Sequence, residues 1–330
     1  GNSAMKIIAV IDADPTCSPI GTRSRLAEPL ADQPVLRRTV QRVLASQGLE
    51  GVCVVTPHGH GPAIRDLLAG LDVDVEEYRA PPPPFRNLII TARKWALPNW
   101  RGGIGGACAL DEDANCALLA AVARRLSADA VLVVPAAAAV VDPALITAMA
   151  AHHRRTCQEM RMTFTQAPPG LAPAIFSTDL LHDLASASTP PGSLLAYRPA
   201  DPRPDLVTRP CCYRVANVVA RTAGRFIADT DRSFRMLEAL LKDAPADTSA
   251  TWPTAEQACQ WLNHRPPAQV DPLPREVEVE LTTSEQLTGT ILRPRGRIVG
   301  HRGPAELSML NRLFQELARL DASLVLLGGF

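Results

Sequence analysis

The stretch from Arg93 to Gly106 brings together residue types that could hold a phosphate or a nucleobase. It contains two tryptophans, three cations and four glycines: Arg93, Lys94, Trp95, Trp100, Arg101, Gly102, Gly103, Gly105 and Gly106. Aromatic faces attract cations and stack on bases, and a glycine-rich loop offers backbone N–H groups to an anion. We take Arg101, Gly102 and Gly103 as candidate nucleotide-binding residues, although a surface loop with packed tryptophans is the plainer interpretation.

The segments that must position such groups alternate between strand-like and helix-like patterns. Apolar runs predict strands at 6–11, 51–56, 73–78, 130–134, 160–165, 174–176 and 225–228. Apolar residues at helical spacing predict helices at 33–45, 63–71, 114–126, 143–153, 178–184 and 233–242. Residues 85–110 and 187–210 are expected to be irregular. The alternation predicts a mostly parallel sheet covered by helices.

A proline-rich stretch, residues 265–274, marks a boundary near the C-terminal end of the sequence. A short helix at 255–263 precedes it, and a strand at 276–281, a helix at 304–320 and a strand at 323–327 follow it. We therefore predict a main domain over 5–243, a linker with a short helix over 244–274, and a small β-α-β fragment over 275–330. Residues 1–4 resemble the remnant of an expression tag.

Bulk composition excludes several classes of partner. Lys plus Arg and Asp plus Glu both number 34, so nothing indicates nucleic acid or an anionic membrane as a bulk partner. The longest apolar stretch, 128–141, is shorter than the roughly 20 residues that span a bilayer, and no signal peptide is evident. We expect a cytoplasmic protein. The eight cysteines form no Cys-x-x-Cys pair, so we expect reduced thiols without a zinc site.

Residues 12–44 resemble the opening of nucleotidyltransferases such as molybdenum-cofactor guanylyltransferases, cytidylyltransferases and sugar-nucleotide pyrophosphorylases. The family pattern has a Gly-x-Gly-Thr-Arg loop, then Pro-Lys-Pro-Leu, then a turn into a helix. This chain has Gly21-Thr22-Arg23, Glu28-Pro29-Leu30 and Asp32-Gln33-Pro34-Val35-Leu36. The resemblance implies a three-layer α/β/α sandwich with a mixed, mostly parallel sheet. It also implies nucleotide binding at Gly21, Thr22 and Arg23.

Two departures from the family pattern affect the phosphate loop. In the family, backbone N–H groups and cations hold a triphosphate while Mg²⁺ assists attack on the α-phosphate. The first family glycine falls on Pro19, which has no N–H to donate. The family lysine falls on Glu28, which reverses the charge. We therefore do not expect tight triphosphate binding in the usual pose.

The family's metal carboxylates are also altered. The aspartate that ends the central strand falls on Ala137, and Asp142 is expected to cap the following helix. A second family carboxylate corresponds to Asp229 or Asp231, which are our candidate metal ligands. An Asx turn with a helix cap is the alternative interpretation of these two residues. With Ala137 opposite, no metal cofactor is expected, and Mg²⁺ would be needed only if the protein is active.

Residues 277–296 resemble the entry to a radical S-adenosylmethionine domain, in which a Glu-Leu-Thr-Thr strand precedes three cysteines that hold a [4Fe–4S] cluster. Here Glu285, Gly289 and Leu292 occupy the cysteine positions, and none can replace a thiolate. We therefore expect no iron–sulfur cluster. Residues 324–329 resemble the second strand of such a barrel. Two strands cannot close a barrel, so we interpret the fragment as part of one, and either the chain is truncated or the piece docks on the main domain. The apolar strand at its end favours truncation or unobserved residues after Phe330.

Three functions remain in competition. We favour a non-catalytic binding or scaffolding module with a nucleotide, a sugar nucleotide or a protein as its partner. The reason is that Pro19, Glu28, Ala137 and the three cysteine positions depart independently. The alternatives are an active Mg²⁺-dependent nucleotidyltransferase with rearranged ligands and a sugar-nucleotide-dependent glycosyltransferase. The latter would use an Asp-x-Asp pair, for which Asp12/Asp14, Asp111/Asp113 and Asp229/Asp231 have the spacing. Catalytic residues stay unassigned.

Overall fold

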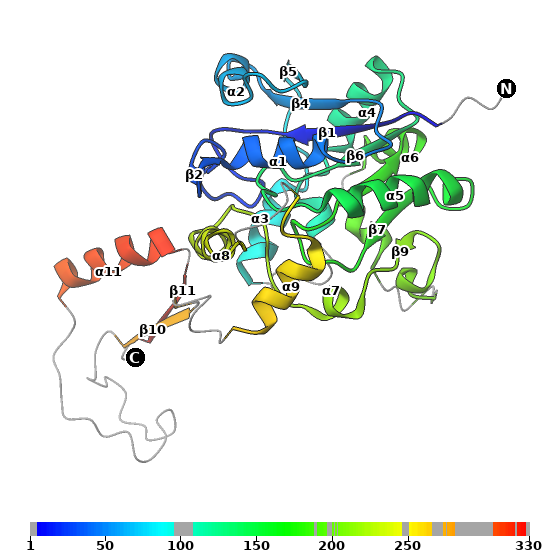
Figure 1. Cartoon of the computed structure of the whole chain (residues 1–330). Helices are drawn as coiled ribbons and strands as arrows, with labels where there is room; N and C mark the ends of the chain where they lie inside the picture. The colour runs from blue at the N-terminus through cyan, green and yellow to red at the C-terminus, as the bar shows by residue number, and fades with distance from the viewer. Residues whose placement is uncertain are drawn as a thin grey trace.

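A seven-stranded mixed sheet forms the centre of the main body (Figure 1). The computed structural model describes residues 5–95, 108–187, 190–196, 200, 202, 204–245, 251–265, 273–274, 276–280, 306–320 and 322–327. The strand order is β5-β4-β1-β6-β8-β7-β9. The first four are mutually parallel, β8 is antiparallel to both β6 and β7, and β9 is parallel to β7. The predicted mixed, mostly parallel sheet is confirmed.

The strands of this sheet are β1 (Ile7–Asp12), β4 (Val52–Pro57), β5 (Asp74–Tyr78), β6 (Ala130–Val133), β7 (Met162–Thr165), β8 (Ala174–Ser177) and β9 (Cys212–Tyr213). A separate small ribbon pairs β2 (Pro29–Leu30) with β3 (Gln33–Pro34). The helices of the main body are α1 (Val35–Leu44), α2 (Gly61–Leu67), α3 (Arg86–Trp95), α4 (Cys116–Arg125), α5 (Pro143–Thr156), α6 (Thr178–Leu184), α7 (Asn217–Arg221), α8 (Asp231–Lys242) and α9 (Ala255–Asn263). Short 3₁₀ turns are η2 (Ala109–Asp111), η3 (Pro191–Leu194) and η4 (Leu206–Thr208).

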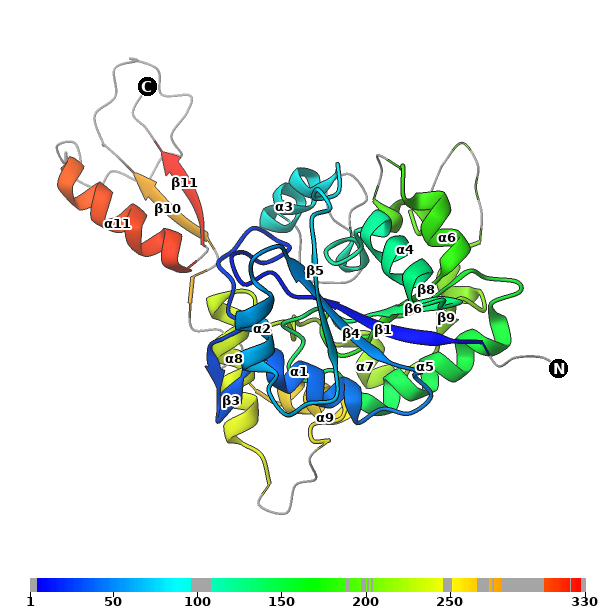
Figure 2. The same cartoon turned by 90° about the horizontal axis from the view of Figure 1, so that it is seen from above.

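Helices cover both faces of the sheet, as Figure 2 shows. Strand β1 alternates between the two resulting cores, because Ile7 and Ile11 pack with one and Ile8 and Val10 with the other. The first core includes side chains of α1, α2, α5, α8 and α9, and the second includes those of α4 and α6. This gives the three layers that the resemblance implied.

Helix α9 packs into the first core, although it lies in the stretch expected to link two domains. Its Ala255, Ala258 and Cys259 are buried there. Asp142 caps two helices at once, because one carboxylate oxygen accepts from the N–H of Ala144 at 2.9 Å and the other from that of Ala255 at 2.7 Å. Asp142 is thus the helix cap that the sequence predicts, and it also holds the first turn of α9.

A small unit beside α8 contains β10 (Glu276–Glu280), α11 (Leu307–Leu320) and β11 (Ser323–Leu327), as Figure 1 shows. The two strands pair in parallel and form a sheet of their own. The guanidinium of Arg232 in α8 donates to the carbonyls of Leu273 at 2.9 Å and Pro274 at 2.8 Å. The predicted strand, helix and strand are present, and Glu285, Gly289 and Leu292 lie outside the described residues.

Two local expectations are wrong. Helix α3 begins at Arg86, inside a stretch expected to be irregular, because Phe85, Ile89 and Ala92 form a buried stripe at helical spacing. The strand expected at 225–228 is absent from that described segment. Its N–H groups bond to loops instead, since Phe226 donates to Pro169 at 2.8 Å and Ala228 to Ala137 at 2.9 Å. No described helix is long and apolar enough to cross a membrane.

Candidate functional site

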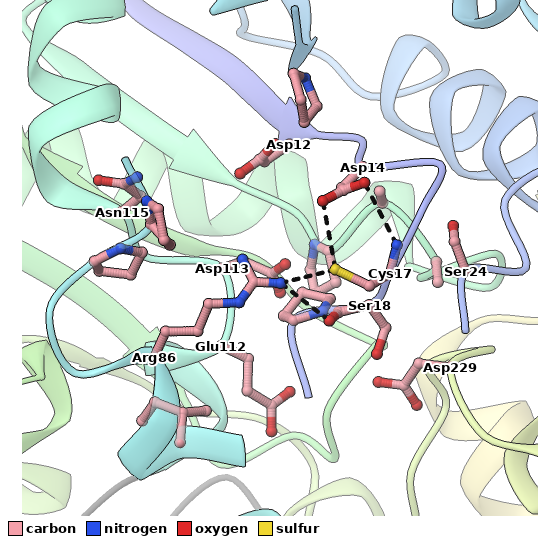
Figure 3. Close-up of a pocket in the computed structure, with 18 of the residues that line it drawn as sticks. Asp12, Asp14, Cys17, Ser18, Ser24, Arg86, Glu112, Asp113, Asn115 and Asp229 are labelled. Carbon is pink, nitrogen blue, oxygen red and sulfur yellow. Dashed lines mark hydrogen bonds between the residues drawn. The ribbon is translucent and has the colours of Figure 1, made fainter. Parts of the chain in front are cut away.

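A cleft opens where the parallel strands end. It has a volume of about 490 Å³, and its lining includes the last residues of β1 and β5 together with residues that follow β4 and β6. From β1 the chain continues to β4 and β5 on one side, and it then returns to β6 on the other side of β1, so the strand order reverses here. Ligands of open α/β sheets bind at such a reversal, outside the carboxyl ends of the strands. This cleft is therefore the candidate site (Figure 3).

The three Asp-x-Asp pairs named from the sequence converge on this cleft. Five of their six aspartates line it, namely Asp12, Asp14, Asp111, Asp113 and Asp229, and Glu112 joins them. Figure 3 shows Asp12, Asp14 and Asp113 around the upper part of the opening, with Glu112 and Asp229 lower down. These acids come from three segments that are far apart in the sequence, around residues 12–14, 111–113 and 229. Only the fold brings them together. The cleft is thus rich in carboxylates.

Asp12 is the last residue of β1 and faces Tyr78, the last residue of β5. The phenol of Tyr78 donates a hydrogen bond of 2.9 Å to Oδ1 of Asp12. Burial raises the pKa of Asp12 to about 6, against the hydrogen bond from Tyr78 and with a further rise from Asp14. The nearby Arg86 opposes that rise. Asp12 therefore changes its protonation state near neutral pH.

Asp14 has a structural role, because its carboxylate accepts hydrogen bonds from the turn that follows it. Its Oδ1 accepts from the backbone N–H of Thr16 at 2.8 Å and from the Thr16 hydroxyl at 2.6 Å. Burial alone would raise the pKa of Asp14, but these donors and those of Cys17 outweigh it, so the pKa is lowered. Asp14 is an ionised carboxylate that closes its own turn.

Asp113 is the carboxylate without a partner. No hydrogen bond or ion pair reaches its side chain from any residue that the structure describes. Burial raises its pKa well above the ordinary value, and the carboxylates of Glu112, Asp12 and Asp229 add to the rise against Arg225. Asp113 thus lies among three other acids without a hydrogen-bond donor from the described residues.

Glu112 and Asp229 are held by arginines at the floor of the cleft. The Arg225 guanidinium contacts Glu112 Oε2 at 2.8 Å and donates from Nε to Asp229 Oδ1 at 2.9 Å. Arg93 in α3 contacts Glu112 Oε1 at 2.8 Å. Burial would lower the pKa of Arg225, but Asp229 and Glu112 outweigh it and raise the pKa far above the usual range. The acids and arginines form a buried, charge-balanced cluster.

Asp229 does lie beside Ala137, where the family aspartate was expected to have been lost. The N–H of Ala228 donates to the Ala137 carbonyl at 2.9 Å, and both Ala137 and Asp229 line the cleft. The Asp229 carboxylate is nevertheless engaged by Arg225 through both oxygens. Asp231, the first residue of α8, pairs with Arg25. The two candidate metal ligands are thus brought near the cleft but are each paired with an arginine.

The phosphate-loop residues lie along the other side of the cleft. Gly21 has φ +82°, and a Cβ added there would meet Ile90 of α3 at 3.1 Å, so the loop needs glycine at this position. The Thr22 hydroxyl donates to the backbone carbonyl of Asp229. Arg23 pairs with Glu28 and is mostly exposed. Of the loop, Ser18, Pro19, Ser24 and Arg25 line the cleft, whereas Gly21, Thr22 and Arg23 do not.

Glu28 neutralises the cations of this loop. It pairs with Arg23 through Oε1 and with Arg25 through Oε2 at 2.9 Å. Arg25 is 7% exposed, pairs also with Asp231, and lies over the Phe234 ring with its guanidinium carbon 5.2 Å from the ring centre. The Glu28 carboxylate therefore engages both arginines of this loop, Arg23 and Arg25.

Arg101, Gly102 and Gly103 lie outside the described residues, so their prediction stays untested. Arg93, from the same stretch, is buried against Glu112. The sequence interpretation missed Tyr78, Arg86 and Arg225. Tyr78 and Arg86 line the cleft, and Arg86 donates to Cys17 Sγ at 3.1 Å. Helical spacing around Phe85 is the one signal that could have placed Arg86 on a helix. Among the described residues, no group of three or more His, Cys, Asp or Glu is arranged to hold a metal ion.

Comparisons with known proteins show similarity in fold and no similarity to a family model or a curated sequence. No protein-family model matches the sequence, and no curated protein matches it. A cytidylyltransferase from Leptospira borgpetersenii serovar Hardjo-bovis (strain JB197) superposes with a TM-score of 0.51, over 78% of this chain and 94% of its own, at 13% identity. The fold is nucleotidyltransferase-like. At that identity the likeness concerns the fold alone.

Two other solved structures superpose less closely. A CMP:2-keto-3-deoxy-manno-octonic acid synthetase complexed with CTP has a TM-score of 0.37 and 11% identity, over 59% of this chain and 80% of its own. A manganese complex of a Mycobacterium tuberculosis H37Rv protein has a TM-score of 0.36 and 16% identity, over 58% and 81%.

Proposed function

We propose that the main body is a small-molecule binding module that has lost nucleotidyl transfer. The observation that carries this proposal is the capture of Arg23 and Arg25 by Glu28 and Asp231. A triphosphate would have to displace two internal carboxylates before it met those cations, and Pro19 offers it no N–H. The protein keeps a cleft at the position where this fold binds ligands.

A magnesium ion in the family's manner does not fit the residues present. Ala137 has no oxygen in its side chain, and Arg225 engages both carboxylate oxygens of Asp229. Mg²⁺ requires hard oxygen ligands in octahedral geometry and would compete with a buried guanidinium for Asp229. We therefore derive no step of a reaction through a metal at this position.

The test is pyrophosphate release with each of the four ribonucleoside triphosphates, in Mg²⁺ and in Mn²⁺, with sugar phosphates as acceptors. We expect no release above a sample without protein. The variant Glu28→Lys, which places the family's residue in the loop, is the informative companion because it frees Arg23 and leaves Arg25 with Asp231 alone. Metal-dependent release by the unchanged chain would refute the proposal.

A second candidate is an active transferase with rearranged ligands. Asp12 and Asp113 favour it, because they bring carboxylates to the cleft from β1 and from the loop after η2. This candidate requires the double variant Asp12→Asn, Asp113→Asn to abolish a measured pyrophosphate release, while Asp66→Asn in α2 leaves it unchanged.

For residues 275–330 we propose a radical-SAM-like fragment without a cluster. The parallel pairing of β10 and β11, with α11 between them in sequence, supports it. Anaerobic reconstitution with iron and sulfide, followed by iron analysis and visible absorbance, tests this proposal. We expect no bound iron, and a stable chromophore would refute it.

A further inference from the structure

We propose that the cleft binds an organic cation, a small molecule with a protonated amine or guanidine on an apolar body. This inference rests on the proposed loss of nucleotidyl transfer and names the ligand class of the same cleft. It follows from three features of the described residues: which carboxylates are compensated, which cations are already engaged, and what forms the remaining wall.

Four of the six acids on the cleft have partners. Glu112 and Asp229 are held by Arg225. Asp111 accepts from the N–H groups of Cys108 at 2.6 Å and of Gly192, and Asp14 accepts from Thr16. Asp12 and Asp113 are left: the first has only the Tyr78 phenol, and the second has no partner among the described residues.

The arginines of the cleft do not balance these two acids. Arg25 is bound by Glu28 and Asp231, and Arg79 is bonded to His58 at 2.7 Å at the exposed edge. Arg86 is the remaining arginine of the lining, and it donates to the Cys17 sulfur at 3.1 Å and to the Ser18 carbonyl at 3.4 Å. Arg79 keeps its charge but is exposed to solvent, which screens it. Deeper in the cleft one arginine, Arg86, faces the carboxylates of Asp12, Asp14 and Asp113, so negative charge is in excess there.

The rest of the wall is apolar and larger than an ion requires. Tyr78, Phe85, Ile89 and the proline run 81–83 line the cleft, and Phe85 and Ile89 are buried. A volume of about 490 Å³ lies within the range of small-molecule sites, which are mostly apolar with a few placed polar groups. The absence of a three-ligand metal group among the described residues fits an organic cation better than a bare metal ion.

Asp12 and Asp113 are also costly to keep ionised in a cleft without a ligand. A carboxylate removed from water is unfavourable unless a cation or hydrogen-bond donors compensate it. Asp12 faces Tyr78, Asp14 and Arg86, whereas Asp113 faces Glu112, Asp12, Arg225 and Asp229, and burial raises the pKa of both. The described residues give these two carboxylates little compensation, and an ammonium or guanidinium bound in the cleft would supply it.

The experiment uses a matched pair of probes on the full chain, benzylamine and benzyl alcohol, which differ in charge and share the aromatic ring. Binding is measured by calorimetry or by NMR shift perturbation at pH 7.5. We expect benzylamine to bind at least about tenfold more tightly than the alcohol. The double variant Asp12→Asn, Asp113→Asn should lose that preference, and Asp66→Asn should keep it. Far-ultraviolet circular dichroism and a thermal melt verify that each variant folds.

Three results would overturn the inference. They are equal affinity for the two probes, an unchanged preference in the double variant, and binding of MnCl₂ that excludes benzylamine. Pyrophosphate release from CTP and Mg²⁺ is measured on the same samples. Release would refute the loss of catalysis, whereas no release together with no amine preference would refute this inference alone.

Discussion

The two sides of the cleft treat charge in opposite ways. On the phosphate-loop side, Arg23 and Arg25 are matched by Glu28 and Asp231, so each cation finds an anion inside the protein. On the strand side, Asp12 has a phenol for a partner and Asp113 has none among the residues described. The first side is closed to a new anion, and the second is open to a new cation.

Between these two sides, the acids Glu112 and Asp229 at the floor of the cleft are paired with arginines. Arg225 lies between Glu112 and Asp229, and Arg93 gives Glu112 a second cation, so two guanidiniums balance the two buried carboxylates. The contrast teaches that the number of acids in a site says little about its chemistry. What matters is which acids are still without a partner after the fold has formed.

The largest effect expected is from Arg225→Ala, which removes the cation shared by two buried carboxylates. Asp229 would lose its cation and Glu112 would keep only Arg93, which should lower the free energy of unfolding by about 3–5 kcal/mol. Urea unfolding at pH 7.5 measures it. Arg155→Ala, an exposed arginine of α5, is the matched control and should change stability little. A loss as small as that of the control would mean that the floor of the cleft is not held by this arginine.

The next largest effect is a pH dependence of stability that arises from Asp12 on the strand side of the cleft. The folded-state pKa of Asp12 is raised from 3.8 to about 6. The folded protein therefore binds more protons than the unfolded chain between these values, and stability falls as pH rises through that window. The contribution is on the order of 3 kcal/mol, since each pKa unit corresponds to about 1.4 kcal/mol. Asp12→Asn should therefore gain stability relative to the unchanged chain as pH rises from 4 to 7.

Asp14→Asn is the opposite control for the pH experiment. The pKa of Asp14 is lowered in the folded protein, so its ionised form contributes stability that is lost as pH falls. Urea unfolding at pH 3 and pH 7 on the unchanged chain, Asp12→Asn and Asp14→Asn should give differences of opposite sign for the two variants, because the contribution of Asp14 is lost at and below its ordinary pKa of 3.8. If the free energy of unfolding changed equally with pH in both variants, Asp12 and Asp14 would not differ in the way that their pKa shifts predict.

The smallest effect tests the closed side. Glu28→Gln keeps the size of the side chain and removes the charge that neutralises Arg23 and Arg25. Tripolyphosphate should then bind about tenfold more tightly, a change of about 1.4 kcal/mol, measured by calorimetry at low salt. Glu50→Gln, whose partner Arg154 lies away from the cleft, is the control and should bind tripolyphosphate like the unchanged chain. No change in Glu28→Gln would show that Glu28 does not block the loop.

The elements of the fold could largely be predicted because their physical signals are local. The buried parallel strands are apolar runs, and α6 and α9 have the bounds that their patterns predict. The segment 225–228 misled the prediction because an apolar run bonded to two loops has the composition of a strand. Helix α3 was missed because the proline run before it suggested irregular chain.

The site could be predicted only as a set of candidates. Spacing singled out the three aspartate pairs, and the fold brings five of those six side chains to one cleft. Spacing could not say which acids stay unpaired, because their partners come from distant positions. Arg225 meets Glu112 across 113 residues, and Arg25 meets Asp231 across 206. Such pairings are set by packing, which no local pattern encodes.

The double cap at Asp142 sets the size of the smallest piece that can fold alone. Its two oxygens serve helices that begin 112 residues apart, at Pro143 and Ala255, and Arg42 donates to the carbonyls of Val141, Trp252 and Pro253 at 2.6–2.8 Å. A chain shortened to end at residue 243 would strand a buried guanidinium and half of a buried carboxylate. The autonomous unit therefore extends to α9, and a gene fragment for expressing it should end after residue 265.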